Sequence, residues 1–389
     1  MNRMIGAILG TALFALPAAA QDEIVYGGSL PLTGVFAFAG EEGVKGIADY
    51  IDIVNEQGGI AGRKVRFEYE DTGYQVNQSI AVFNKLTSQY PVSLYYGDST
   101  AFAKTIAPEL ERMKTMIVGG ASFASEINDP VKFPYQYMAG PDYGEMVGIL
   151  MEYIARETPG AKVVLVNSDT EFGRDPIAAS RAAAERLGLN IVEEIVTAPG
   201  SVDVSTEVLK LRRARPDYTI FHGYVLSPLP EFMSQARELG LETKFMGTFW
   251  SMDASIWRSV GAPADGFMGV MPYRYYDDEA ENAPMLEEIR KRRPEYQASY
   301  YTQGFLSAML ALEATRRVLE KGEALNGDTL KAALNTIEDF DTGGIIGVPI
   351  SVPGNSVPVG RIYRFDAASS HMEPVSDWIT LEPKTGTRD

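Results

Sequence analysis

The sequence alternates between short apolar segments and segments whose apolar residues recur at helical spacing, and this alternation constrains the fold most. Near the start, the segments 24–26, 65–69, 92–96 and 116–118 have the composition of strands. Between them, the segments 44–54, 80–86 and 106–113 carry apolar residues about one helical turn apart, which predicts helices. Strands separated by helices in this way form parallel sheets with helices on both faces. We therefore predict a protein of the α/β class.

The alternation starts again after residue 140 and changes in the last third of the chain. Further strands are predicted over 163–166, 191–196 and 218–221, with helices over 178–187, 204–211 and 229–239. Two helices follow, over 299–321 and 327–337, and then strand-like segments over 345–350, 361–365 and 378–381. No flexible linker separates the two blocks. This organisation predicts two doubly wound parallel-sheet lobes joined by short crossovers.

Residues 1–20 have the three parts of an export signal. Arg3 gives a short basic segment, an apolar segment runs from Met4 to Leu16, and residues 18–20 are alanines that suit a cleavage enzyme. The apolar segment is too short to cross a membrane comfortably. We predict a signal peptide over 1–20 and a mature, soluble chain that begins at Gln21, located in the periplasm of a cell with an outer membrane.

The composition excludes several functions. The chain has 35 Lys and Arg residues against 52 Asp and Glu residues, and the formal net charge of −17 repels nucleic acid and anionic lipid. Cysteine is absent, so disulfides, thiolate metal sites and cysteine nucleophiles are excluded. The only histidines are His222 and His371. We predict no cofactor, no metal site and no nucleic-acid partner.

The catalytic motifs that the sequence suggests do not fit their context. Asp-Thr-Gly occurs at 71–73 and 341–343, as in aspartic proteases, but that chemistry is found in β-rich lobes. We find no phosphate-binding loop, no metalloprotease motif and no hydrolase nucleophile motif. Because no nucleophile–base pair is evident, we predict that the chain is not an enzyme. His222, at a strand end, is interpreted as a hydrogen-bonded structural residue.

Hydroxyls, glycines and aromatic residues gather directly after several predicted strands. The loops concerned are 95–100, 119–123, 169–173, 223–224 and 247–250. Ligands of open parallel sheets bind outside the carboxyl ends of the strands, so two such sheets predict a site in the cleft between them. Hydroxyls and free amides at a helix N-terminus can bind a carboxylate without an arginine. Ser99 or Thr100 would also make an ordinary helix cap.

Short motifs in a specific order connect the chain to a known family. They are Gly-Ser-Leu-Pro-Leu-Thr-Gly at 28–34, Val-Asn-Glu-Gln-Gly-Gly-Ile-Ala-Gly-Arg at 54–63, Glu-Asp at 70–71, Phe-Gly at 172–173, Ala-Arg-Glu-Leu-Gly at 236–240 and Phe-Met-Gly at 245–247. Together they make residues 22–385 resemble the type I periplasmic solute-binding proteins of ABC importers, in the group of leucine/isoleucine/valine-binding proteins. The resemblance implies two lobes, joined by three crossovers, that close around one small ligand. We place lobe 1 at 22–141 plus 272–348 and lobe 2 at 142–271 plus 349–385.

The resemblance also implies which residues bind the ligand. Ser99 would hold a ligand carboxylate, with Ala121 and Ser122 beside it. Phe172 and Tyr224 would cover the ligand from the second lobe. The full predicted set is Phe38, Asp98, Ser99, Thr100, Ala121, Ser122, Phe172, Tyr224, Phe249 and Trp250.

One departure from the family pattern bears on the ligand. The acid that pairs with the α-ammonium of an amino acid should follow residues 246–247, but Thr248-Phe249-Trp250 contains no carboxylate. A buried ammonium without a counter-charge is costly. We therefore predict a ligand with a carboxylate or similar polar head, no ammonium, and an apolar or aromatic body. The alternative is an amino acid, amide or urea, with Asp98 either as the replacement acid or as a helix cap.

The resemblance further implies a partner. The receptor would deliver its ligand to the membrane subunits of an ABC permease, and we expect a monomer. A sensor that presents the same ligand to a membrane signalling protein is a second class with the same fold. Permease and ATPase genes beside this one would indicate transport, and ligand returned unchanged after incubation would distinguish a receptor from an enzyme.

Overall fold

The computed structural model describes residues 23–352 and 354–382, so the predicted signal peptide lies outside the described residues. Lobe 1 is built on a four-stranded sheet in the order β2-β1-β3-β4, and its neighbouring strands are parallel. The strands are β1 (Ile24–Leu30), β2 (Val65–Asp71), β3 (Val92–Gly97) and β4 (Ile117–Gly120). The central strand β1 is buried along its whole length, which explains its nearly continuous apolar and glycine sequence.

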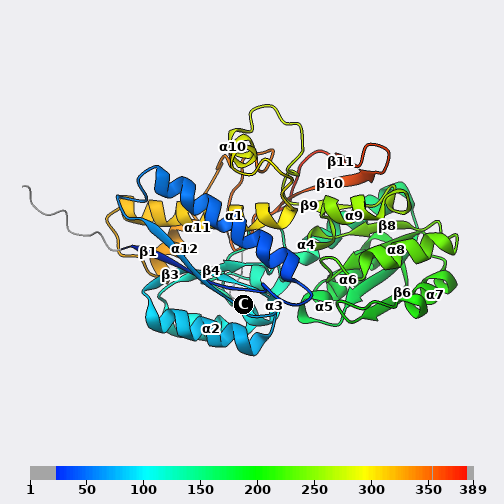
Figure 1. The fold of residues 1–389 in the computed structure, drawn as a ribbon. Helices are drawn as coiled ribbons and strands as arrows, with labels where there is room; N and C mark the ends of the chain where they lie inside the picture. The colour runs from blue at the N-terminus through cyan, green and yellow to red at the C-terminus, as the bar shows by residue number, and fades with distance from the viewer. Residues whose placement is uncertain (1–22, 353, 383–389) are drawn as a thin grey trace, which may run out of the picture.

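Helices cover both faces of this sheet. They are α1 (Ala37–Glu56), α2 (Val76–Gln89), α3 (Thr100–Met113), α11 (Ser299–Glu320) and α12 (Gly327–Leu334). Figure 1 shows α1 and α11 on one side of the sheet and α2 on the other. A Cβ on Gly46 of α1 would lie 2.0 Å from the Tyr301 carbonyl oxygen of α11. Only glycine permits this backbone-to-backbone contact, which anchors α11 in lobe 1.

Lobe 2 is built on an eight-stranded sheet in the order β11-β10-β9-β8-β7-β5-β6, with β12 paired to β10. Its strands are β5 (Lys162–Ser168), β6 (Asn190–Thr197), β7 (Tyr218–His222), β8 (Lys244–Gly247), β9 (Met268–Met271), β10 (Val359–Asp366), β11 (His371–Pro374) and β12 (Ile379–Thr380). The five strands from β5 to β9 are parallel, whereas β10 runs antiparallel to β9. Both the parallel sheets and the two-lobed α/β class are therefore confirmed.

The remaining helices complete the second lobe and the connections. They are α4 (Tyr143–Glu157), α5 (Glu171–Arg174), α6 (Ile177–Leu187), α7 (Ser205–Ala214), α8 (Leu229–Glu238), α9 (Ala254–Val260), α10 (Pro284–Arg292) and the short 3₁₀ helices η1 (Ser125–Asn128), η2 (Phe249–Ser251) and η3 (Ala262–Ala264). Within the described ranges, no helix combines the length and the apolarity that crossing a membrane requires.

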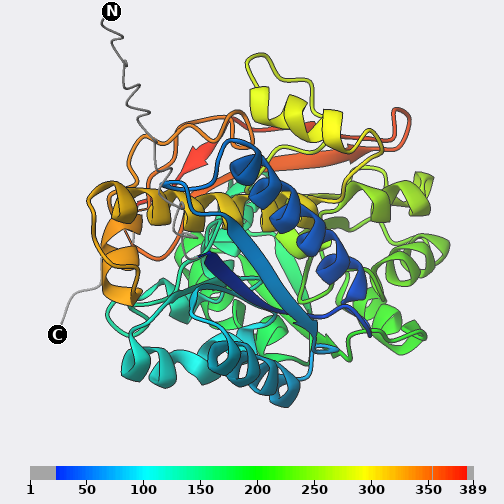
Figure 2. The same cartoon turned by 60° about the vertical axis from the view of Figure 1, so that its left-hand side comes forward.

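The chain crosses between the two lobes three times. It passes from β4 to α4, from β9 toward α11, and from α12 back to β10. Figures 1 and 2 show the last crossing as the orange and red C-terminal part of the chain, whose strands β10 and β11 lie at the edge of the second sheet. The residue boundaries predicted for the lobes remain predictions.

One predicted strand is wrong. Residues 345–350 form turns and bends, and only an isolated bridge joins Phe340 to Ile350. Gly343 and Gly344 precede this segment with positive φ angles of 65° and 91°. These left-handed residues turn the chain, so the apolar residues that follow are buried without forming a ladder.

Candidate ligand-binding site

A cavity lies where the carboxyl ends of the lobe 1 strands meet lobe 2. Lobe 1 contributes Leu30, Pro31, Phe36, Ala39, Gly40, Tyr74, Tyr96, Asp98, Ser99, Thr100 and Ala121. From the other side come Tyr143, Phe172, Val225 and Trp250. The cavity therefore occupies the position that the strand-end loops predict.

Six aromatic side chains, from both lobes, line the cavity. The Phe36 ring lies 4.3 Å from that of Tyr74 and 6.5 Å from that of Phe172, measured between centroids. On the lobe 2 side, the Tyr143 and Phe172 centroids are 5.2 Å apart, and Trp250 Nε1 donates a hydrogen bond of 3.0 Å to the Tyr143 hydroxyl. Such a wall suits an apolar or aromatic ligand body.

Asp71, at the end of β2, holds two loops of this wall together. Its Oδ1 accepts hydrogen bonds from the backbone N–H groups of Leu32 at 2.8 Å, Thr33 at 3.1 Å and Gly73 at 2.9 Å. Burial raises the pKa of Asp71, but these bonds and that from the Thr33 hydroxyl outweigh it and lower the pKa overall. The loops before Phe36 and Tyr74 are fixed by this carboxylate, which explains the position of the Asp-Thr-Gly motif without protease chemistry.

The polar end of the cavity is formed by Asp98, Ser99 and Thr100, between β3 and α3. Ser99 is the N-cap of α3, and its Oγ accepts a hydrogen bond of 3.2 Å from the Phe102 N–H. The Thr100 hydroxyl lies 2.9 Å from the Ser122 hydroxyl. The cap and the ligand-site interpretations therefore do not exclude each other, because Ser99 caps its helix while lining the cavity.

Asp98 is 2% exposed and is fixed on one side only. Its Oδ2 accepts hydrogen bonds from the hydroxyl groups of Thr72 and Ser79, the latter at 2.7 Å. Its Oδ1 is buried and has no hydrogen-bond partner among the described residues. Burial raises the pKa of Asp98, and the nearby hydroxyls of Thr72, Ser79 and Ser99 oppose this effect only in part.

No side chain with a positive charge balances this carboxylate among the described residues of the cavity wall. Among the described lining residues, none is lysine, arginine or histidine, and Asp98 is the single carboxylic acid. Burial also raises the pKa values of the lining tyrosines Tyr74, Tyr96 and Tyr143, which keeps their hydroxyls neutral. Asp98 is therefore the one carboxylate among the described residues that line the cavity.

The structure brings part of the predicted site together. Six predicted residues line the cavity, namely Asp98, Ser99, Thr100, Ala121, Phe172 and Trp250. Four others, Phe38, Ser122, Tyr224 and Phe249, are absent from its wall.

Each of these four is held elsewhere by its own contacts. Phe38 packs edge-on against Tyr300 at 5.6 Å, and Ser122 bonds to Thr100 at 2.9 Å. The Tyr224 hydroxyl lies 2.8 Å from that of Thr197, deep in lobe 2. Phe249 is fully buried against neighbouring rings, 5.6 Å from Phe123. These four residues therefore do not line this cavity, and their predicted part in ligand binding stays a prediction.

Sequence reasoning missed several lining residues. The aromatic ones are Phe36, Tyr74, Tyr96 and Tyr143. Tyr96 belongs to a strand-end loop that the sequence singles out, and Phe36 precedes the predicted Phe38 by two positions, so both were within reach. Tyr74 adopts a left-handed φ of 62°, which its sequence does not signal.

His222 has the structural role that the sequence analysis assigns to it. Its Nε2 donates to the Phe172 carbonyl oxygen at 2.8 Å, and its Nδ1 accepts from the Thr248 hydroxyl at 2.7 Å. Burial lowers the pKa of His222 to about 3, so the ring is neutral at physiological pH. The ring thereby fixes the loop that carries Phe172 into the cavity wall.

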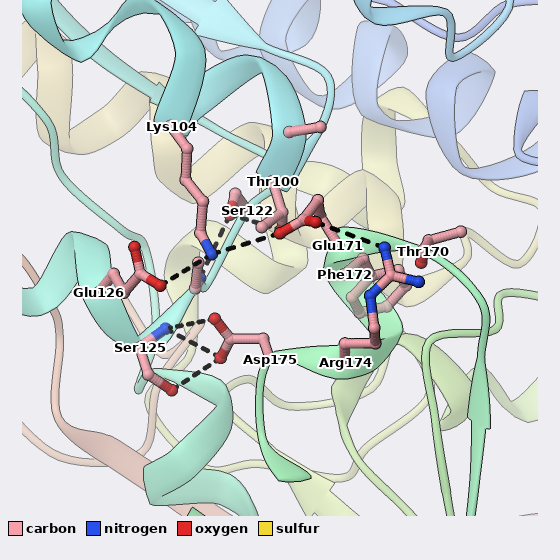
Figure 3. A network of polar contacts seen from close by, with 12 residues as sticks. Thr100, Lys104, Ser122, Ser125, Glu126, Thr170, Glu171, Phe172, Arg174 and Asp175 are labelled. Carbon is pink, nitrogen blue, oxygen red and sulfur yellow. Dashed lines mark hydrogen bonds and ion pairs between the residues drawn. The ribbon is translucent and has the colours of Figure 1, made fainter. Parts of the chain in front are cut away.

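Beside the cavity, a polar network connects the lobes (Figure 3). Lys104 of α3 lies 3.0 Å from Glu126 and 3.5 Å from Glu171 of α5, measured between charged atoms. The Ser125 N–H donates to both carboxylate oxygens of Asp175, at 3.0 and 3.1 Å, and its hydroxyl donates to Oδ1 at 2.7 Å. These contacts hold the two lobes together at one edge of the cavity.

Comparisons with known proteins identify relatives of this architecture. A Brucella melitensis protein named Leu/Ile/Val-binding protein homolog 3 is 21% identical over 363 residues, covering 88% of this chain and 94% of its own. Among solved structures, a branched-chain amino acid ABC transporter protein from Thermus thermophilus with bound valine superposes with a TM-score of 0.85 at 24% identity, covering 93% of this chain and 98% of the other. A fatty acid ABC transporter substrate-binding protein from Thermomonospora curvata superposes with a TM-score of 0.82 at 18% identity, covering 95% and 97%.

The family assignment rests on most of the chain. The sequence model of the periplasmic binding protein family matches residues 23–368, which span both lobes and all three crossings. This is a family of solute-binding receptors and not of enzymes, in agreement with the two lobes and the cavity between them. The chain therefore belongs to the periplasmic binding protein family.

Proposed function

We propose that the chain is the extracytoplasmic solute-binding receptor of an ABC importer and delivers a small, carboxylate-bearing ligand with an apolar or aromatic body. The observation that carries this proposal is the cavity itself. Six aromatic residues line it, and its polar residues gather at the N-terminus of α3. An apolar body would contact the rings, and a carboxylate would face the hydroxyls and amides of the helix terminus.

The ligands named for the structural relatives support a carboxylate head. The Thermus protein has valine bound, and the Thermomonospora protein is named for fatty acids. Both ligand types combine a carboxylate with an apolar body, although they differ at the α-carbon. Asp98 favours a second candidate, an amino acid or amide. Its negative charge would repel the carboxylate of a ligand that has no nitrogen donor to bind Asp98.

A thermal-shift screen tests the proposed ligand class. The panel contains branched-chain amino acids, their 2-oxo acids, aromatic carboxylates and small amides. A ligand at a hundredfold excess over its Kd should stabilise the protein by about 2.7 kcal/mol. If sugars, metal ions or polyamines gave shifts while the whole panel gave none, the proposed ligand class would be wrong.

Delivery to a permease and location in the periplasm are parts of the same proposal. Mass measurement of the exported protein should give a chain that begins at Gln21. Reconstitution with the permease and ATPase encoded beside the gene should give ligand-dependent ATP hydrolysis. A ligand-dependent response from a neighbouring membrane sensor, with no effect on an ATPase, would favour the signalling alternative.

A further inference from the structure

We infer that Asp98 is the specificity-determining acceptor for a nitrogen donor on the ligand, so that the receptor selects amino-acid-like or amide-bearing ligands over bare carboxylates. This inference rests on the proposed function, because it concerns the polar end of the same cavity. It also replaces one prediction from the sequence, namely that the ligand lacks an ammonium group.

The first argument is the uneven bonding of the Asp98 carboxylate. Oδ2 accepts from two hydroxyls, Thr72 at the end of β2 and Ser79 of α2. The Thr72 hydroxyl itself accepts from the Tyr74 N–H at 3.3 Å, so its proton is directed to Asp98. Oδ1 is buried and has no hydrogen-bond partner in the part of the chain that the structure describes. An unpartnered buried oxygen costs free energy in the empty receptor, and a ligand donor would remove that cost.

The second argument is the position of Asp98 directly before Ser99. Both residues line the cavity, and Ser99 is the N-cap of α3, whose first backbone amides can donate hydrogen bonds to a carboxylate. In an α-amino acid the ammonium and the carboxylate are attached to the same carbon. The carboxylate of Asp98 would bind the ammonium, and the helix N-terminus at 99–100 would bind the carboxylate. The two adjacent binding positions therefore match the two groups of an α-amino acid.

The third argument is the absence of a competing counter-charge. No lysine, arginine or histidine occurs among the described residues that line the cavity. The residues that face Asp98 from the packed elements are the hydroxyls of Thr72, Ser79 and Ser99 and the tyrosines Tyr74, Tyr95 and Tyr96. Asp98 therefore takes over, from lobe 1, the role of the acid that is missing from residues 248–250 of lobe 2.

The test measures Kd by calorimetry for matched ligands with and without the nitrogen. Leucine is compared with its 2-oxo acid, and phenylalanine with its 2-oxo acid and with its N-acetyl amide, in which a neutral N–H replaces the ammonium. Each ligand is measured on wild type, Asp98→Asn and the control Asp52→Asn on the exposed surface of α1. Wild type and the control should prefer the amino acid or amide. Asp98→Asn should bind the amino acid at least about tenfold more weakly, with the 2-oxo acid unaffected or bound more tightly.

The pH dependence of wild-type binding tests the inference even if Asp98→Asn does not fold. Binding of an ammonium favours ionised Asp98, so affinity should fall as the pH is lowered through the raised pKa of this group. A bare carboxylate requires protonated Asp98, and its affinity should rise in the same direction. N-acetylphenylalanine keeps an N–H donor but has no ammonium charge, so its affinity separates a requirement for positive charge on the ligand from a requirement for a hydrogen bond to Asp98.

Three outcomes are possible. The pattern just described supports the inference. Tighter binding of the 2-oxo acids to wild type, with no loss in Asp98→Asn, overturns the inference but leaves the proposed receptor function intact. If no member of the panel binds wild type, both the proposed ligand class and the inference are wrong.

Discussion

Replacing Asp175 with alanine should weaken ligand binding even though Asp175 does not line the cavity. In the structure, the lobes are joined by three hydrogen bonds from Ser125 to this carboxylate, at 2.7 to 3.1 Å. Two of these bonds share the Ser125 N–H, so the replacement leaves two donors, the N–H and the hydroxyl of Ser125, without their acceptor. If the ligand is enclosed only when the lobes are together, loss of these contacts lowers the population of the binding-competent state.

The magnitude follows from the kind of bond. A hydrogen bond to a charged group contributes roughly 1.5–3 kcal/mol, and burial, which raises the pKa of Asp175, offsets part of the total. A net loss of about 2 kcal/mol corresponds to roughly a thirtyfold increase in Kd. X-ray scattering of the ligand-free protein should show a larger radius of gyration for the variant.

The matched control is Asp169→Ala. Asp169 precedes α5, the helix that Asp175 follows, and it is exposed. Its ion pair is formed with Arg174 within lobe 2. This control should bind ligand like the wild type. A Kd for Asp175→Ala within twofold of wild type, measured by calorimetry with the tightest ligand of the panel, would refute a role of this contact in closure.

Three further predictions concern single residues. For His222, whose pKa falls from 6.5 unfolded to about 3 folded, the unfolded chain binds a proton that the native protein does not. Stability should therefore decrease as pH falls from about 6.5 toward 3, by up to about 1.4 kcal/mol per pH unit, and urea titrations of His222→Gln should lose this slope while His371→Gln keeps it. Trp250→Ala should weaken an aromatic ligand by roughly 1–3 kcal/mol in calorimetry, whereas an unchanged affinity would place the indole's role in lobe packing alone. Ligand-free Asp98→Asn should be more stable than wild type at neutral pH by about 1 kcal/mol, because burial disfavours ionised Asp98. This gain in stability should vanish as the pH is lowered to the unfolded pKa of about 4. If urea titrations at pH 7 gave a less stable variant, both oxygens of the wild-type carboxylate would have to be satisfied.

The sequence predicts which segments meet at the cavity better than it predicts which side chains face it. The positions of Ser99 and Phe172 follow from local patterns, because each lies just after a strand whose length and direction are set by its apolar residues. The orientation of Tyr224 depends on its bond to Thr197, a residue of another strand. Neither the left-handed backbone at Tyr74 nor the hydrogen bond from the Ser79 hydroxyl to Asp98 can be read from the neighbouring sequence. Such details arise from contacts between distant segments, which one sequence does not reveal.

The pairing of β10 with β9 has a consequence for the order in which the protein can fold. The strands from β5 to β9 leave the ribosome well before residues 359–366, so the β9 edge of the lobe 2 sheet stays unpaired until synthesis is nearly complete. An unpaired edge can associate with other chains, and closing this long loop slows folding. Lobe 2 is therefore encoded in the middle of the gene but is finished last. A truncation that removes only the final strands should damage this central lobe, while the sheet of lobe 1, made from residues 24–120, would be left with all its strands.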